Sequence, residues 1–324
     1  MADMSAELWS WVDAQPEYTA EVPEGALVTA VLVTRNGEDW LPDALDSLSA
    51  LTTRPGRLIA VDNGSEDGTA EILANALAAG ALTSVIAGEA GWGFGDAIAK
   101  ALEGIEPTTW LWFLHDDIVV MPDTLQRMLV QTAQSPDADI VVPMLLRPGR
   151  RHHAARISEL GASISHAGRR ELGLEPGEIG QGQHDPTTVL GGSTCGMLIL
   201  WSQFEALGGF DPALPMHRDG VDLGWRATLA GGIAVTCPDA RIVHRQVSLR
   251  GLRTGTLAQQ RHRTETGFDQ FLGMRAVLAH ERGLAAFGTA IRLTIGTLFR
   301  ALGLLLGKRP ESSVEELRAL GDLI

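Results

Sequence analysis

The chain has 324 residues, of which 45% are hydrophobic, and its 26 Lys and Arg against 40 Asp and Glu give a net charge of −14. This amount of apolar material excludes a disordered chain, and two cysteines in this length exclude a disulfide scaffold. The acidic balance argues against a nucleic-acid partner, because such proteins usually carry a basic surface.

Four strands and four helices alternate in the first 134 residues. Short β-branched or apolar runs predict strands at 26–33, 57–61, 84–87 and 110–114, and helical spacing of apolar residues predicts helices at 39–51, 69–79, 96–103 and 122–134. This alternation predicts an α/β fold with a mostly parallel sheet and helices on both faces.

The second half is less regular. The sequence predicts strands at 139–144, 233–237 and 241–244, a short helix at 202–207 and a helix at 219–230. A hairpin or long loop over the site is expected at 147–186, and 189–201 holds a glycine-containing segment followed by an apolar run. The two cysteines, Cys195 and Cys237, lie in apolar stretches without metal-ligand spacing, which predicts reduced, buried thiols in a cytoplasmic protein.

Polar or glycine-rich residues follow each of the first four predicted strands, at 34–36, 62–65, 88–93 and 115–117. Because ligands bind at the carboxyl ends of parallel strands, we expect these segments to converge on one crevice. Asp116 and Asp117 follow the fourth strand directly, and paired carboxylates there can bind Mg²⁺ or Mn²⁺ and leave coordination positions for a diphosphate. The alternative for this pair is a cap for the following helix.

Five motifs in order carry a resemblance to a known family. They are VLVTRN at 31–36, VDNGSEDGT at 61–69, the Asp116–Asp117 pair, GGFD at 208–211 and DGVDLGWR at 219–226. Over residues 27–250 the sequence resembles family 2 glycosyltransferases of the GT-A fold, including actinobacterial cell-envelope enzymes such as rhamnosyl- or galactofuranosyltransferases. The resemblance implies a GT-A catalytic domain at 27–250, between an acidic lead-in at 1–26 and a basic helical segment at 251–324.

The family implies a nucleotide-diphosphate sugar donor, a divalent metal and, usually, inversion at the anomeric carbon. The resemblance assigns the metal to Asp117, with Asp116 and His244 as further ligands. It assigns the donor side to a set of strand-end residues: Thr34, Arg35, Asn36, Asp62, Asn63, Gly91, Gly93 and Asp116. Alternative interpretations are an Asx-turn for Asp62 and a purely structural role for His244.

The general base lies, in the family, in an acid pair at the start of a late helix. Here the second position of that pair holds Gly220, so the resemblance leaves two candidates, Asp219 first and Asp222 second. On the acceptor side it implies Gly192, Ser193 and Thr194, with Trp225 as a residue that could stack on a sugar ring or belong to the core.

The basic charge is concentrated near the C-terminus. Between residues 241 and 309 twelve basic residues stand against three acidic ones, which gives +9 there and −23 for the remainder. The apolar stretch 284–306 is long enough to span a membrane, but its large side chains gather on one side of a helical wheel: Leu284, Phe287, Ile291, Ile295, Leu298, Leu302 and Leu305. This pattern favours a helix lying on an anionic membrane, and the alternatives are packing on the catalytic domain or the start of a spanning region.

The sequence therefore predicts a metal-dependent, inverting glycosyltransferase at the inner face of the plasma membrane, peripheral and cytoplasmic, which acts on a glycan or polyprenyl-linked acceptor. The first 25 residues contain no basic residue and do not predict a signal peptide. A nucleotidyltransferase of similar fold and a non-catalytic nucleotide-sugar-binding relative remain the alternatives.

Overall fold

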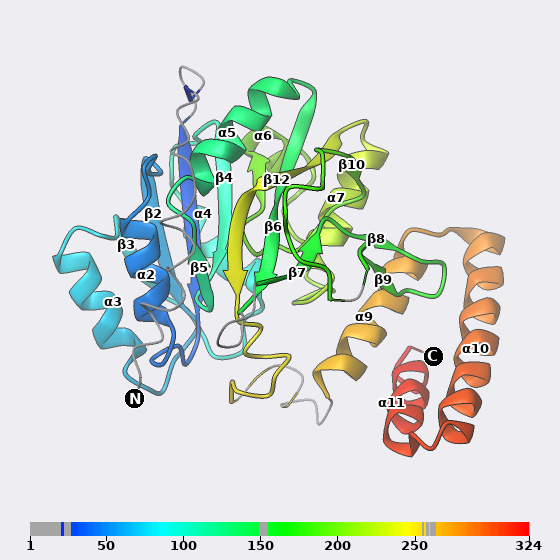
Figure 1. The fold of residues 1–324 in the computed structure, drawn as a ribbon. Coiled ribbons are helices and arrows are strands. Elements are labelled where there is room, and N and C mark those ends of the chain that lie inside the picture. The colour runs from blue at the N-terminus through cyan, green and yellow to red at the C-terminus, as the bar shows by residue number, and fades with distance from the viewer. Residues whose placement is uncertain are drawn as a thin grey trace.

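The computed structural model describes residues 21–22, 27–148, 155–175, 177–254, 256, 259 and 264–323 (Figure 1). The predicted lead-in at 1–26 therefore lies outside the described residues except for 21–22. The described chain forms a sheet domain followed by a helical segment.

The N-terminal half of the sheet is parallel, as predicted. Its strands are hydrogen-bonded in the order β3-β2-β1-β4, with β1 Val28–Thr34, β2 Arg57–Asp62, β3 Ser84–Ala87 and β4 Trp110–His115. The helices between them are α2 Leu41–Ser49, α3 Thr69–Ala78 and α4 Phe94–Leu102. The register pairs Thr34 with Asp62 and Val33 with His115, so the polar strand ends share one edge of the sheet.

The second half of the sheet is mixed. The antiparallel strand β11 (Leu198–Leu200) lies between β4 and β6 (Ala138–Arg147), and β12 (Ile233–His244) runs parallel to β6. The two strands predicted at 233–237 and 241–244 are one strand, β12, which has a register shift between Cys237 and Arg241. The shorter strands on this sheet are β5 Ile118–Val120, β7 Arg156–Leu160 and β10 Thr188–Val189.

The stretch 147–186 combines an edge strand with a hairpin. β7 pairs with β6, and β8 (Ser163–Ile164) pairs with β9 (Arg170–Glu171) outside the main sheet. The remaining helices of the domain are α5 Thr124–Gln134, α6 Trp201–Ala206 and α7 Asp219–Leu229.

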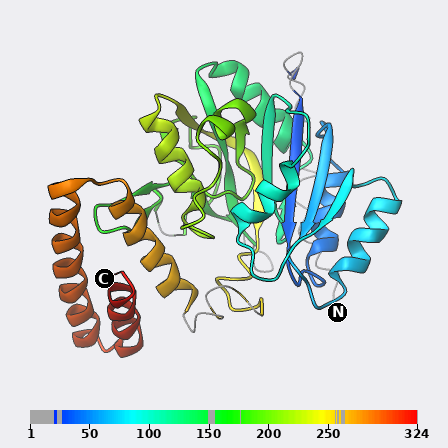
Figure 2. The ribbon, with the colours of Figure 1, turned by 180° about the vertical axis from the view of Figure 1, so that it is seen from behind.

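Side chains alternate between the two faces of the sheet and build two cores. Leu32 and Trp112 belong to the core under α2 and α5, whereas Val31 and Phe113 belong to the core under α4, α6 and α7. Both faces are therefore covered by helices, as Figures 1 and 2 show from opposite sides. This three-layer arrangement confirms the predicted α/β fold.

Three helices follow the sheet domain at one side: α9 Glu265–Ala279, α10 Gly283–Leu306 and α11 Pro310–Gly321 (Figure 1). α10 packs on α9 and α11 through small or narrow side chains, of which Thr289, Leu293, Thr297 and Ala301 are buried. It is long and apolar enough to cross a membrane.

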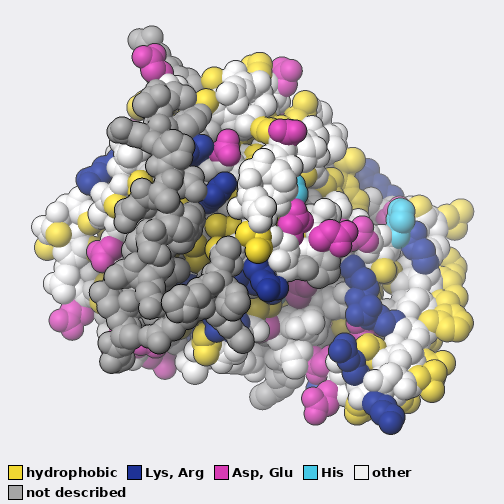
Figure 3. Space-filling view, in the orientation of Figure 1, with side chains coloured by type: hydrophobic (Ala, Val, Ile, Leu, Met, Phe, Trp, Pro, Cys, Tyr) yellow, Lys and Arg dark blue, Asp and Glu magenta, His cyan; other side chains and the backbone are white. Residues whose placement is uncertain are grey.

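The apolar stripe predicted on α10 faces outward. All seven of its members are exposed, from 45% at Ile291 to 90% at Leu284, and hydrophobic side chains line the outer edge of the helical segment in Figure 3. Packing of this stripe on the catalytic domain, one of the alternatives, is therefore wrong. α10 packs on its neighbours through the side that carries Thr289, Thr297 and Ala301, and the apolar stripe on its other side is exposed.

Candidate active site

A cavity of about 240 Å³ opens at the carboxyl ends of the strands. All four predicted strand-end segments contribute to it, so the predicted convergence is confirmed. The predicted site residues that line the cavity are Thr34, Arg35, Asn63, Gly93, Asp116, Asp117, Ser193, Thr194, Asp219 and His244. Those that do not line it are Asn36, Asp62, Gly91, Gly192, Asp222 and Trp225.

Two of the non-lining residues hold the loops that shape the donor side. The Asp62 carboxylate accepts hydrogen bonds from the Ser65 backbone N–H at 3.0 Å and from the Ser65 hydroxyl at 2.5 Å. The partner lies three residues on, not the two of the Asx-turn alternative. The Asn36 side chain accepts from the Glu66 N–H at 2.8 Å. The Asp62 contacts hold the loop after β2, and the Asn36 contact ties the loop after β1 to it. The predicted donor roles of both residues stay predictions.

Asp116 is held by four hydrogen bonds. Its Oδ2 accepts from the Thr34 hydroxyl at 2.7 Å, the Arg35 N–H at 3.1 Å and the Arg253 Nη1 at 2.9 Å. Its Oδ1 accepts from the Arg253 Nη2. Both oxygens are engaged, which weighs against the predicted role of Asp116 as a metal ligand and leaves it suited to position the donor side.

Arg253 was not predicted as a site residue. Its guanidinium also donates to the Arg35 carbonyl and lies 5.0 Å from the centre of the Trp40 ring. Burial by itself lowers the pKa of Arg253, but the Asp116 carboxylate outweighs this and raises it. The residue belongs to the basic stretch that we attributed to an anionic partner, and nothing in its local sequence signals that it reaches Asp116.

Asp117 and His244 form an ion pair at the cavity wall. The Asp117 Oδ1 lies 3.3 Å from the His244 Nε2, and the Asp117 Oδ2 accepts from the Val247 N–H at 3.0 Å. Burial would raise the pKa of Asp117, but the charge and hydrogen bond of His244 hold it well below its usual range. The carboxylate is therefore ionised and keeps Oδ1 directed at the imidazole.

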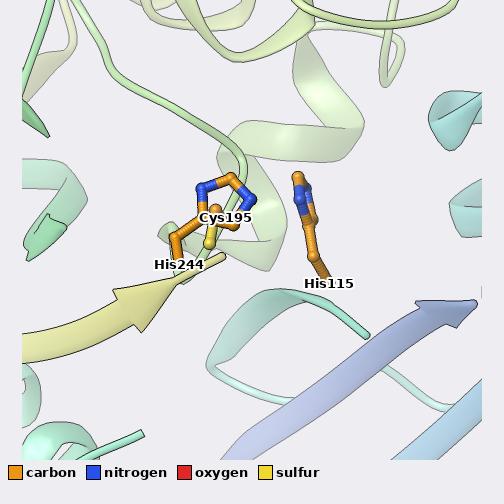
Figure 4. Close-up of side chains that lie close together, drawn as sticks. All are labelled: His115, Cys195 and His244. Carbon is orange, nitrogen blue, oxygen red and sulfur yellow. The ribbon is translucent and has the colours of Figure 1, made fainter. Parts of the chain in front are cut away.

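His115 and Cys195 complete a cluster with His244 (Figure 4). The ligand atoms of the three residues all lie within 4.8 Å of one another. The prediction of a buried, free thiol is confirmed for Cys195, but its surroundings are not apolar as expected. Burial and the neighbouring His244 lower the pKa of His115 to about 3, so this imidazole is neutral.

Asp219 lies at the first turn of α7 and lines the cavity. Its Oδ1 accepts from the Gly220 N–H at 2.9 Å, and burial raises the pKa of its carboxyl to about 6. A carboxylate with a pKa close to neutral can accept a proton from a substrate hydroxyl. This position and pKa make Asp219 the stronger of the two predicted base candidates.

Asp222 and Trp225 point to other partners. The Asp222 Oδ2 lies 2.7 Å from the Arg226 Nε, and its Oδ1 lies 3.7 Å from the His280 Nε2. The Trp225 ring stacks on His280 with 3.9 Å between ring centres and an interplanar angle of 5°. Their catalytic and acceptor roles stay predictions, and the contacts favour a role in joining α7 to α9.

The glycine at the usual position of the second acid has a packing reason. A Cβ on Gly220 would lie 2.3 Å from the Gly192 carbonyl oxygen, and one on Gly224 would lie 2.1 Å from that of Leu190. Real Cβ atoms do not come so close to backbone, so α7 needs glycine here in order to pack on the 190–194 loop.

The hairpin region brings two further unpredicted residues to the cavity. The Glu159 carboxylate of β7 accepts from the Arg170 Nη2 at 2.6 Å and from the Ser193 N–H at 2.5 Å. These bonds join the hairpin to the loop before β11, on the predicted acceptor side.

The helical segment also contacts the site across the predicted boundary at 250. His217 lines the cavity and its Nε2 lies 2.9 Å from Glu265 in α9, while the buried Arg218 pairs with Asp269 at 2.7 Å. The boundary stays a prediction, and these two contacts show that α9 supports the start of α7.

A cavity at the carboxyl ends of parallel strands, lined by both acidic and basic side chains, is the ligand-site arrangement of an open α/β sheet. Residues 29–179 match the sequence profile of glycosyl transferase family 2. The chain is 27% identical over 250 residues to N-acetylglucosaminyl-diphospho-decaprenol L-rhamnosyltransferase of Mycobacterium tuberculosis, which covers 69% of this chain and 78% of the relative. Residues 29–179 of the chain are therefore a glycosyl transferase family 2 match, and the chain is similar to a family member over 69% of its length.

Solved structures support the fold. S. aureus TarS 1-349 in complex with UDP-GlcNAc aligns with a TM-score of 0.55 and 15% identity over 92% of this chain and 80% of that one. GalNAc-T7 with UDP, GalNAc and Mn²⁺ aligns with a TM-score of 0.56 and 16% identity over 68% of this chain, which spans 44% of GalNAc-T7. Both similarities support the GT-A fold that the sequence predicted.

Proposed function

We propose that this glycosyltransferase moves a sugar, with inversion, from a nucleotide-diphosphate sugar to a hydroxyl of a polyprenyl-linked cell-envelope glycan. One observation carries the proposal: the buried Asp219 carboxylate, with its raised pKa, shares a cavity with the Asp117–His244 pair. The mycobacterial relative is named for a decaprenol-linked acceptor and TarS binds UDP-GlcNAc, which supports this substrate class.

Asp117 and His244 fit a divalent cation, Mn²⁺ or Mg²⁺. A carboxylate oxygen and an imidazole nitrogen 3.3 Å apart, both on the cavity wall, are ligands that Mn²⁺ accepts. The GalNAc-T7 structure contains Mn²⁺, which supports a metal in this fold. When bound, the ion would neutralise the charge that develops on the nucleoside diphosphate as it leaves.

The donor side is proposed along the ends of β1 to β4. Thr34, Arg35 and Asn63 line the cavity there, and Arg253 adds a fixed positive charge beside Asp116. Side chains that hydrogen bonds already hold in place need little reorganisation when the nucleotide binds. We assign Asp116 and Arg253 together to positioning the nucleotide, and the nearby loop residues Asn36, Asp62, Gly91 and Gly93 to shaping that side.

Asp219 would take the proton of the acceptor hydroxyl as its oxygen attacks the anomeric carbon. The attack comes from the side opposite the leaving diphosphate, so the configuration at that carbon inverts. The Gly220 N–H bond to Oδ1 fixes the carboxylate, and Oδ2 is the oxygen that we assign to the proton. Glu159, Arg170 and Ser193 form the hydrogen-bonded wall nearby that we assign to the acceptor.

A transfer assay tests this function. The full chain with Mn²⁺ is incubated with individual nucleoside-diphosphate sugars and polyprenyl-diphosphate-linked N-acetylglucosamine. Release of nucleoside diphosphate with a glycosylated lipid of inverted anomeric configuration, read by NMR, is expected. In a parallel reaction with a nucleoside triphosphate and a sugar 1-phosphate, formation of a nucleotide sugar with release of pyrophosphate would instead identify a nucleotidyltransferase. Retained configuration in the transfer assay would contradict the role of Asp219.

We propose that α10 holds the enzyme on an anionic membrane surface, where a polyprenyl-linked acceptor resides. Its outward stripe includes Leu284 at 90% and Phe287 at 66% exposure, and Arg292 and Lys308 are exposed elsewhere on the same segment. One side of α10 packs on α9 and α11, so it suits a helix lying in the interface better than one surrounded by lipid.

Flotation with vesicles containing phosphatidylglycerol tests the membrane proposal. The wild-type chain is expected to float, and a variant with Phe287→Gln, Leu298→Gln and Leu302→Gln is expected to remain in the unbound fraction. Leu229→Gln is the matched control, because Leu229 is 70% exposed on α7 of the sheet domain. Equal recovery of wild type and the triple variant, or a lipid-independent dimer held by the stripe in sedimentation, would contradict the proposal.

A further inference from the structure

The ends of two strands and one loop, all far apart in sequence, bring His115, Cys195 and His244 together. His115 ends β4, Cys195 lies in the loop before β11, and His244 ends β12. Their ligand atoms lie within 4.8 Å of one another, and the Asp117 Oδ1 is 3.3 Å from the His244 Nε2. Figure 4 shows the sulfur of Cys195 beside the His244 ring, with His115 facing them.

The ligand chemistry of this cluster differs from that of a magnesium or manganese site. Mg²⁺ and Mn²⁺ prefer carboxylate, carbonyl and water oxygens, whereas thiolate and imidazole together favour Zn²⁺. A cysteine, two histidines and a carboxylate also supply the four ligands of a tetrahedral zinc site. We propose that His115, Cys195 and His244, with Asp117, form a binding site for Zn²⁺.

The geometry requires only a small closure. Tetrahedral zinc with bonds of about 2.0–2.3 Å places its ligand atoms roughly 3.3–3.8 Å apart. The three atoms lie within 4.8 Å of one another, so they must approach by at most about 1.5 Å. The Thr194 Oγ1 lies 3.0 Å from the His115 Nε2 and orients that ring. His115, Asp117 and His244 line the cavity, which gives an ion a route to the buried sulfur.

The second cysteine has a different environment. The Cys237 Sγ lies 3.7 Å from the Arg127 carbonyl oxygen, and the residue packs in the core that contains α2 and α5. Both thiols are free and buried. Cys237 is therefore a matched control for Cys195.

Zinc and the donor-binding metal would compete for the site. Asp117 and His244 belong to both ligand sets, so one ion excludes the other. This consequence rests on the proposed function, whereas the zinc site itself does not, because zinc binding can be measured without donor, acceptor or turnover.

Cobalt spectroscopy on the reduced, metal-free full chain tests the site. Co²⁺ is expected to give a thiolate-to-cobalt charge-transfer absorption with one ion per chain, which Zn²⁺ removes. Cys237→Ser keeps this absorption and Cys195→Ser loses it. Zinc affinity, measured against a chromophoric chelator, is expected to fall at least 10- to 100-fold in Cys195→Ser and in His115→Gln.

Two results would overturn the zinc site. One is the absence of a charge-transfer absorption in the wild type, and the other is unchanged zinc affinity in Cys195→Ser. Circular dichroism checks folding, and His115→Gln provides an independent variant if Cys195→Ser does not fold. Failure of sugar transfer with an intact cobalt spectrum would contradict the proposed function and leave the zinc site standing.

Discussion

Replacing Asp219 by Asn is expected to slow transfer strongly while preserving the fold. The Asn side-chain oxygen can still accept from the Gly220 N–H, which Asp219 binds at 2.9 Å, but the amide cannot take a proton from the acceptor. Loss of a general base typically costs about 10²–10⁴-fold in rate. We therefore expect kcat to fall by that factor with the Kd for UDP unchanged.

The pH dependence follows from the same carboxyl. With a pKa of about 6, Asp219 is roughly 90% ionised at pH 7 and roughly 10% at pH 5. Because the ionised form is the base, kcat/KM of the wild type should fall about tenfold between pH 7 and pH 5. The residual activity of Asp219→Asn should lack this dependence.

The folding stability of the wild type is expected to rise as the pH falls from 7 to 5, whereas its activity falls. The pKa is raised in the folded state because burial disfavours the charge, so ionisation above pH 6 costs folding stability, and this cost disappears as the pH falls below the ordinary pKa near 4. The difference between 3.8 and about 6 corresponds to about 3 kcal/mol as an upper limit. Asp219→Asn should therefore be as stable as the wild type at pH 8, or more stable by up to that amount.

Asp222→Asn is the matched control. It weakens the 2.7 Å pair with Arg226 and should lose about 1–3 kcal/mol in urea unfolding, with the wild-type pH profile of transfer retained. Transfer assays from pH 5 to 8 and urea midpoints at pH 5 and 8 make the comparison. The assignment of Asp219 is refuted if its Asn variant loses activity and stability together, or if Asp222→Asn alone removes the pH dependence.

Three further outcomes are expected. Arg253→Gln releases Asp116 and should weaken UDP binding by about 1.5–3 kcal/mol in calorimetry; an unchanged Kd would remove Arg253 from the donor side. Asp117→Asn should lose the extra thermal stabilisation that Mn²⁺ adds to UDP binding, and a shift equal to that of the wild type would contradict the proposed metal site. Gly220→Ala places a Cβ 2.3 Å from the Gly192 carbonyl and should cost at least about 1–3 kcal/mol in urea unfolding, whereas Gly288→Ala, with open space around it, should not destabilise α10.

The sequence predicted the elements and the face of the sheet that carries the site. Apolar runs with short polar ends encode β1 to β4 locally, and parallel pairing then aligns their ends, so Thr34, Asn63 and Asp117 reach one cavity as expected. The stripe on α10 was equally visible, because helical periodicity is a local property. Its outward direction was not, since that depends on which side of α10 packs on α9 and α11.

The charge pattern along the chain showed no sign of ion pairs between residues far apart in sequence. Part of the basic stretch at 241–309 pairs with acids of the sheet domain: Arg245 binds Asp43 and Arg253 binds Asp116. Sequence composition counts such charges as free, because the ion pairs join residues more than a hundred positions apart. Part of the basic stretch therefore pairs with acidic residues of the sheet domain and is not available to an anionic partner.

The tertiary structure alone decided the chemistry of single residues. Asp219 and Asp222 are three positions apart on one helix, yet one carboxylate faces the cavity and the other pairs with Arg226. Cys195 reads as an inert thiol until strand pairing brings it beside His244. Spacing along the chain determines secondary structure, whereas pKa, ligand sets and the need for glycine at position 220 depend on neighbours that only the packed fold supplies.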